Sequence, residues 1–158
     1  PITAHLLATG EIVFDPRGEM ARWQERGREA LRNVPELGDA GRTSRSYFAA
    51  CVFEDACERI DEDPATAVMF LGEAVERMLS FALARAGQWM PRRKELLGVV
   101  EGFDPELARL ARAFLLEGDP ARKLELAGEM ADRTIEARGF FEWEAERDPV
   151  AETLQSRS

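Results

Sequence analysis

A cluster of cations near the middle of the chain is the part of this sequence whose residue types could bind a ligand. Residues 85–94 hold four basic side chains and no acidic one, around the motif Gly87-Gln88-Trp89-Met90-Pro91. Guanidinium groups bind carboxylates and phosphates, and an indole ring stacks on other aromatic groups. The segment therefore predicts a small binding surface for an aromatic or phosphorylated group. This surface would consist of Trp89, Arg92, Arg93 and Lys94.

The same segment has a purely structural interpretation, which the sequence leaves open. Trp89 would close the end of a helical bundle, Pro91 would shape the turn, and the cations would be solvated at the start of a helix over 92–101. Cations are slightly unfavourable at a helix N-terminus, whereas a bound anion is favourable there. The position of the cations therefore leaves an anion-binding site as the alternative to this structural interpretation.

Other residues that could do chemistry do not form a recognisable catalytic group. His5 is the only histidine, and we expect it to be a surface or packing residue because zinc sites need three or four converging ligands. The acidic run 61–63 has no glycine turn before it, so it predicts a solvated helix cap rather than a metal site. Ser44 and Ser46 lack a base for nucleophilic attack, and we expect both to cap a helix.

Composition restricts the classes of function. A chain of 158 residues with 45% hydrophobic residues is large enough for one globular core, and its net charge of -9 disfavours general binding to nucleic acids. Neither a membrane span nor a signal peptide is evident, and Cys51 and Cys57 are too far apart on one helix to form a disulfide. We therefore expect a cytoplasmic protein in which both cysteines are reduced core residues.

Three Asp-Pro pairs predict where helices begin. Aspartate is a good N-cap and proline suits the first helical position, so helices are expected over 64–86, 105–117 and 120–138. Glycines are expected to end them, because glycine readily adopts the left-handed conformation that terminates a helix. These predicted stops are Gly87, Gly118 and Gly139.

The apolar spacing adds further elements. In the helix over 64–86 one buried stripe is predicted, formed by Val68, Leu71, Val75, Met78, Leu79 and Ala82. Further helices are expected over 18–34 and 44–61, the latter with a stripe formed by Phe48, Val52, Ala56 and Ile60. The segment 35–43 is a candidate hinge, Trp23 and Trp143 are expected in the core, and the tail 140–154 is too apolar to be a mere linker.

One segment does not fit an all-helical interpretation. Residues 11–14 are β-prone and lie between Gly10 and the turn 15–18, which predicts a single short strand. Because a lone strand leaves backbone groups unpaired, this strand would need a second chain or further sequence as its partner. The expected fold class is thus an all-α, up-and-down bundle of five to seven helices with a short N-terminal β element.

The N-terminal order and the Trp89 motif together resemble a known family. A helix, Gly10, a strand ending at Asp15 and then Pro16-Arg17-Gly18 are similar to the last part of a minimal bacterial nucleotidyltransferase domain. The motif over 87–97 is similar to the Gly, aromatic, Pro, Lys, Leu segment in the C-terminal bundles of kanamycin-nucleotidyltransferase-like and HEPN-type proteins. Trp89, Pro91 and Lys94 are the matching positions.

This resemblance implies that the two parts of the chain have different roles. Residues 1–34 would correspond to the end of a nucleotidyltransferase domain, and residues 42–154 to the helical bundle that binds substrate or docks the catalytic domain. Such enzymes hold Mg²⁺ and the nucleotide with a Gly-Ser turn followed by an Asp-x-Asp pair. This chain has no Gly-Ser dipeptide and therefore no matching Asp-x-Asp, so these cofactors would bind only to a catalytic domain supplied elsewhere. A HEPN nuclease is also excluded, since no arginine precedes His5.

The alternative function is that of a helical protein-interaction or antitoxin-like module that self-associates through residues 11–14. An enzyme with an unrecognised site remains a third possibility.

Overall fold

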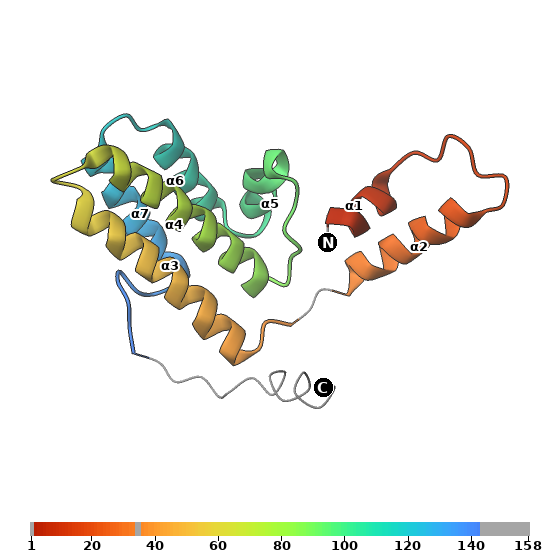
Figure 1. The fold of residues 1–158 in the computed structure, drawn as a ribbon, viewed down its shortest axis with the longest axis horizontal. Helices are drawn as coiled ribbons and strands as arrows, with labels where there is room; N and C mark the ends of the chain where they lie inside the picture. Colours follow the sequence, from red (N-terminus) through yellow and green to blue (C-terminus); the bar gives the residue numbers. More distant parts are fainter. Residues whose placement is uncertain (1, 34–35, 143–158) are drawn as a thin grey trace, which may run out of the picture.

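Seven α-helices and one short 3₁₀ helix form the regular structure of residues 2–33 and 36–142, the part of the chain that this computed structural model describes (Figure 1). The fold is all-α, as the sequence predicts. The elements are α1 (Ile2–Thr9), α2 (Glu19–Arg32), α3 (Asp39–Arg59), α4 (Pro64–Arg85), the 3₁₀ helix η1 (Arg93–Glu95), α5 (Leu96–Phe103), α6 (Pro105–Leu116) and α7 (Pro120–Thr134).

The three Asp-Pro pairs begin helices as predicted. The Asp63 carboxylate accepts the Thr66 backbone N–H at 3.1 Å and begins α4, while Asp104 accepts the Leu107 N–H at 3.0 Å and begins α6. Asp119 caps α7 in the same way. Each carboxylate satisfies a backbone donor that has no partner inside the helix, which fixes the first turn.

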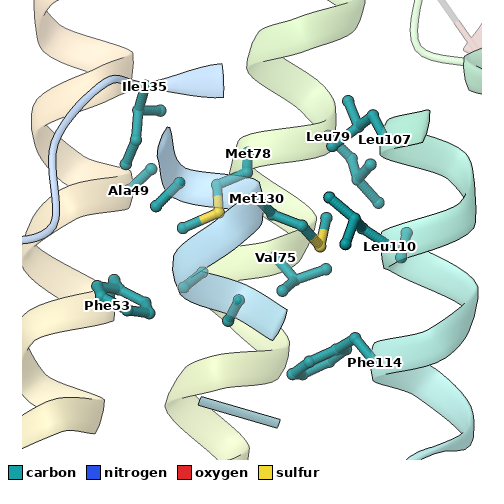
Figure 2. Packing of buried hydrophobic residues seen from close by; sticks show 14 of the residues in the cluster. Ala49, Phe53, Val75, Met78, Leu79, Leu107, Leu110, Phe114, Met130 and Ile135 are labelled. Carbon is teal, nitrogen blue, oxygen red and sulfur yellow. The ribbon is translucent and has the colours of Figure 1, made fainter. Parts of the chain in front are cut away.

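Helix α4 is the centre of the bundle. It packs against α3 and α7, while α6 packs against α7 and α5. Figure 2 shows the core that these contacts enclose, with Phe53 of α3, Met78 of α4, Phe114 of α6 and Met130 of α7 among its members. The predicted stripe of α4 is largely confirmed, since Leu71, Val75, Met78 and Leu79 are buried and Val68 and Ala82 partly buried.

Helix α3 differs from its prediction at its start and in its buried face. It begins at Asp39, so Ser46 lies within the helix, where its buried hydroxyl donates to the Thr43 carbonyl at 3.0 Å. The expectation that Ser44 and Ser46 are caps was therefore wrong. The buried face carries Ala49, Phe53 and Ala56, whereas Phe48 is exposed. Small alanines let the two backbones approach closely, so α3 packs on α4 through them rather than through the larger Phe48.

Two predicted helix ends also need correction. Gly87 has φ 63° and ends α4 as expected, but α7 ends at Thr134, before Gly139. There Glu136, with φ 58°, adopts the left-handed conformation. At the end of α6 the chain leaves in an extended conformation at Glu117, whose carboxylate accepts the backbone N–H groups of Gly118 and Asp119. A side-chain acceptor thus replaces the left-handed turn.

The N-terminal residues form a helical hairpin in place of a strand. Helices α1 and α2 pack on each other, and Figure 1 shows them beside the bundle as a separate arm. Gly27 makes the contact close, because a Cβ there would lie 2.9 Å from the Ala4 carbonyl oxygen. Residues 10–18 connect the two helices without helix or strand, so the expected β element at residues 11–14 is absent from the described residues. No second strand pairs with them in this part of the chain, and an isolated strand is not stable.

Several remaining expectations concern single side chains. Cys51 and Cys57 are free thiols, but Cys57 is exposed and Cys51 only partly buried, so neither belongs to the core. Trp143 and most of the predicted tail lie outside the described residues, although Phe141 packs edge-on against Tyr47 with ring centroids 5.5 Å apart. None of the described helices is long and apolar enough to cross a membrane.

Candidate functional site

The Trp89 segment, residues 87–95, leaves the end of α4 and enters η1. The Gln88 backbone N–H donates to the Leu83 carbonyl at 2.9 Å, which closes the last turn of α4 and fixes the direction in which the chain leaves. Trp89 is half-buried, and its indole Nε1–H donates to the Leu31 carbonyl of α2 at 3.0 Å. The indole thus contacts the N-terminal hairpin, an arrangement that neither interpretation of the sequence included.

Two of the three cations of this segment pair with different acidic side chains. Arg92 pairs with Glu95, and this hydrogen bond holds the pKa of the Glu95 carboxyl below its ordinary value. The Arg93 guanidinium reaches Glu76 of α4 at 2.7 Å. Lys94 has neither a hydrogen bond nor an ion pair within the described residues. Paired cations attract an additional anion less strongly, so nucleotide binding at Trp89, Arg92, Arg93 and Lys94 stays a prediction.

Arg85, the first cation of the basic stretch, turns away from the others. Its Nη1 donates to the Thr134 carbonyl at 2.7 Å and lies 3.7 Å from the Glu136 carboxylate. Together with the Arg133–Asp104 pair it lines a polar cavity of about 250 Å³ between the ends of α4, α5 and α7. The guanidinium groups of Arg85 and Arg133 already bind acceptors of the protein itself, so these bonds stabilise the walls of the cavity.

A second surface lies on the hairpin and consists of exposed apolar side chains. We call it the hairpin surface and define it by Leu6, Ile12, Val13, Phe14 and Met20. Val13 is 92% exposed, Phe14 81% and Leu6 60%. All five line an apolar cavity of about 390 Å³, between α1, α2 and the connecting loop. A concentration of exposed apolar residues of this kind is typical of an interaction site.

The loop that carries the hairpin surface is anchored at both ends but free between them. Gln24 donates to the Gly10 carbonyl at 2.8 Å, and the Asp15 carboxylate accepts the Ala21 N–H at 2.9 Å, which lowers the pKa of Asp15. Among the described residues, the backbone groups of residues 11–14 make no hydrogen bond. The loop therefore offers both apolar side chains and unpaired backbone donors and acceptors.

Trp23 corrects a further expectation. It is 50% exposed on α2, not in the core, and the Arg26 guanidinium lies 5.0 Å from its ring centroid. Trp23, Glu19, Arg22 and Arg26 line a shallow cavity of about 230 Å³. The apolar spacing of α2 predicts a core stripe, but among the described helices α2 packs mainly against α1, so one of its faces stays exposed.

The described residues contain no group of three or more side chains that could hold a metal ion. In the acidic run, Asp63 accepts both the backbone N–H and the hydroxyl of Thr66, so it acts as a cap. His5 is partly buried on α1, and its Nε2 is buried without a hydrogen-bond partner in the described part of the chain.

Comparison with known proteins gives no match to a family model, to a curated protein or to a solved structure. The sequence could have indicated the hairpin surface, because four of its five residues lie within nine positions of the chain, on both sides of Gly10. The contact between Trp89 and the Leu31 carbonyl has no sequence signal, since it joins residues 58 positions apart.

Proposed function

We propose that this chain is a helical recognition domain of a nucleotidyltransferase-like protein and that it acts by docking a catalytic domain. The observation that carries this proposal is the hairpin surface. Large apolar side chains at this level of exposure, around a cavity of about 390 Å³, are costly to leave in water, and a docked partner would remove that cost.

The charge distribution supports docking at the hairpin. Residues 1–33 contain five acidic and five basic side chains, whereas the whole chain has a net charge of -9. The arm therefore adds no net charge of its own, so a partner that docks on it meets less repulsion there than on the acidic remainder of the chain. Apolar contact in the centre with charged residues around it is also the usual anatomy of protein interfaces.

The class of the partner comes from the resemblance of residues 10–18 and of Trp89, Pro91 and Lys94 to nucleotidyltransferase proteins. In this proposal the catalytic domain supplies the carboxylates for Mg²⁺ and the nucleotide, and the bundle contributes recognition. The sequence has no Gly-Ser turn, and its acidic run 61–63 has no glycine turn before it, which is consistent with that division.

A binding experiment with matched variants tests the proposal. The chain is mixed with purified minimal nucleotidyltransferase domains, and complex formation is measured by sedimentation velocity. Replacing Val13 and Phe14 together by Asp should weaken the complex about a hundredfold, because two carboxylates would enter an apolar interface. Leu116→Asp is the control, since Leu116 is 87% exposed on α6, away from the hairpin. No complex with the unmodified chain, or equal weakening by the control, would contradict docking at this surface.

Self-association is the second candidate, and a specific observation favours it. The hairpin surface contains both protruding side chains, Val13 and Phe14, and a cavity, and the backbone of residues 11–14 is unpaired within the described structure. A self-complementary patch of this kind is what a two-fold dimer requires. Sedimentation of the chain alone over a wide concentration range separates the candidates: a dimer that the Val13 and Phe14 variant abolishes favours self-association, and a monomer at all concentrations excludes it.

A further inference from the structure

The hairpin and the bundle are joined by a single polar contact. Within residues 2–33 and 36–142, the only hydrogen bond between them is the one that the Trp89 indole donates to the Leu31 carbonyl, and no ion pair joins them. By contrast α1 and α2 pack closely on each other, with Gly27 against Ala4. The hairpin is thus coherent internally and weakly attached to its neighbour.

Trp89 is well placed to hold the hairpin because its own segment is fixed to the bundle. The Gln88 N–H is bound to Leu83 of α4, and the Arg93 guanidinium reaches Glu76 of the same helix. The Arg92–Glu95 pair braces the following turn. These bonds give a further role to the cations: they position the segment that carries the indole.

The Leu31 carbonyl is available to accept this hydrogen bond. Leu31 lies in the last turn of α2, where the backbone carbonyls lack partners within the helix, and the chain continues at Asn33 in a non-helical conformation. The indole N–H therefore satisfies a carbonyl that the helix itself leaves open. Half-burial of Trp89 limits the access of competing water.

We propose that Trp89 is a latch that fixes the orientation of the hairpin relative to the bundle. When the bond between the indole and the Leu31 carbonyl is broken, α1 and α2 turn together as one unit while the bundle remains folded. The biological use of the latch, which is to hold a docked domain at a defined position, rests on the proposed function. The latch itself is a property of the chain alone and is measured without a partner.

His5 lowers the free-energy cost of releasing the hairpin. Its Nε2 is buried and has no hydrogen-bond partner within the described residues. In this proposal, release of the hairpin exposes this nitrogen to water, and the hydration offsets part of the lost indole bond. A partner that favours either state can then shift the balance.

The first experiment measures the latch in the unmodified chain. The three indole N–H signals are assigned by NMR with single Trp→Phe variants, and their exchange with solvent deuterium is compared. The Trp89 indole proton should exchange at least about tenfold more slowly than that of Trp23, which is half-exposed and makes no hydrogen bond through its indole in the described structure. Equal exchange of the two protons would overturn the latch.

The second experiment measures the orientation. Spin labels are attached to cysteines introduced at Glu29 on α2 and Met69 on α4, with Cys51 and Cys57 replaced by Ala, and the distribution of label distances is recorded. Both sites are exposed, so the labels should not disturb the packing. Trp89→Phe, which keeps a ring but removes the donor, should broaden the distribution, and Trp23→Phe should leave it narrow. A distribution that Trp89→Phe and Trp89→Ala both leave unchanged, while melting shows folded bundles, would contradict the proposal.

Discussion

At the scale of single residues, charged side chains of this protein act mainly as caps and braces. Asp104 is the clearest example, because its carboxylate caps α6 and also pairs with Arg133 near the end of α7, with N–O distances of 2.7 to 2.9 Å. The hydrogen bond from Arg133 is the main reason why the pKa of Asp104 lies below its ordinary value. One side chain thus connects the first turn of one helix with the last turn of another.

We predict that Asp104 contributes to the pH dependence of stability. A carboxyl group whose pKa is lowered on folding stabilises the protein above its unfolded pKa of about 3.9, and this contribution is lost as the pH falls through the lower folded value. Asp104→Asn keeps a capping oxygen but removes the charge. At about pH 7 it should lower Tm by about 2 to 4 °C, a modest effect because Arg133 is half-exposed and screened by solvent.

Thermal melts from about pH 7 down to pH 2 provide the measurement. The difference in Tm between Asp104→Asn and the unmodified protein should shrink as Asp104 becomes protonated. Glu62→Gln is the control, since Glu62 is exposed and makes no ion pair in the described structure. A constant difference at all pH values would show that the charge of Asp104 is not responsible.

At the scale of elements, the contact between α1 and α2 depends on one small residue. A Cβ at Gly27 would lie 2.9 Å from the Ala4 carbonyl oxygen and 3.0 Å from the Leu7 Cβ, so a larger side chain must push the helices apart. We predict that Gly27→Leu loosens the hairpin without unfolding the bundle, because the hairpin lies outside the hydrophobic core. Amide exchange in α1 and α2 should become at least about tenfold faster.

The matched control for this change is Gly72→Ala. Gly72 is also helical, but a Cβ there would meet nothing within 4 Å. The substitution should stabilise α4 by about 0.5 to 1 kcal/mol, because alanine favours helix over glycine. Faster exchange in α4 or α7 of the Gly27→Leu variant would mean that the hairpin and the bundle unfold together, contrary to the prediction.

The basic segment can also be tested as an element. If Trp89, Arg92, Arg93 and Lys94 bind a nucleotide, replacing the three cations together by Gln should abolish the binding measured in a nucleoside triphosphate titration. The thermal stability should stay nearly unchanged, since the ion pairs of Arg92 and Arg93 are at the surface. Equal affinities of the variant and the unmodified chain would leave these cations with only their bracing role.

At the scale of the whole molecule, stability resides in the interface of α3, α4, α6 and α7 (Figure 2). Leu71 is fully buried in α4, and we predict that Leu71→Ala lowers the free energy of unfolding by about 2 to 5 kcal/mol through lost burial and the cavity that remains. Leu116→Ala removes the same atoms from an exposed site and should change it by no more than about 0.5 kcal/mol. Denaturant titrations of both variants give the comparison, and similar costs would argue against the observed core.

The sequence by itself determined the elements whose causes are local. Asp63, Asp104 and Asp119 cap their helices as predicted, because an aspartate before a proline needs only the next three residues to form the cap. The spacing of apolar residues likewise identified the buried face of α4, which has neighbours on more than one side.

The tertiary structure decided everything that depends on which surfaces meet. The same reasoning placed Trp23 and Phe48 in the core, where they are not, because periodicity shows that a helix has an apolar face but not whether a partner covers it. The β-prone run 11–14 became a loop because no strand pairs with it in the described residues, while its apolar side chains became the hairpin surface. The bond from Trp89 to Leu31 joins distant parts of the chain and is fixed only by the packing of the folded molecule.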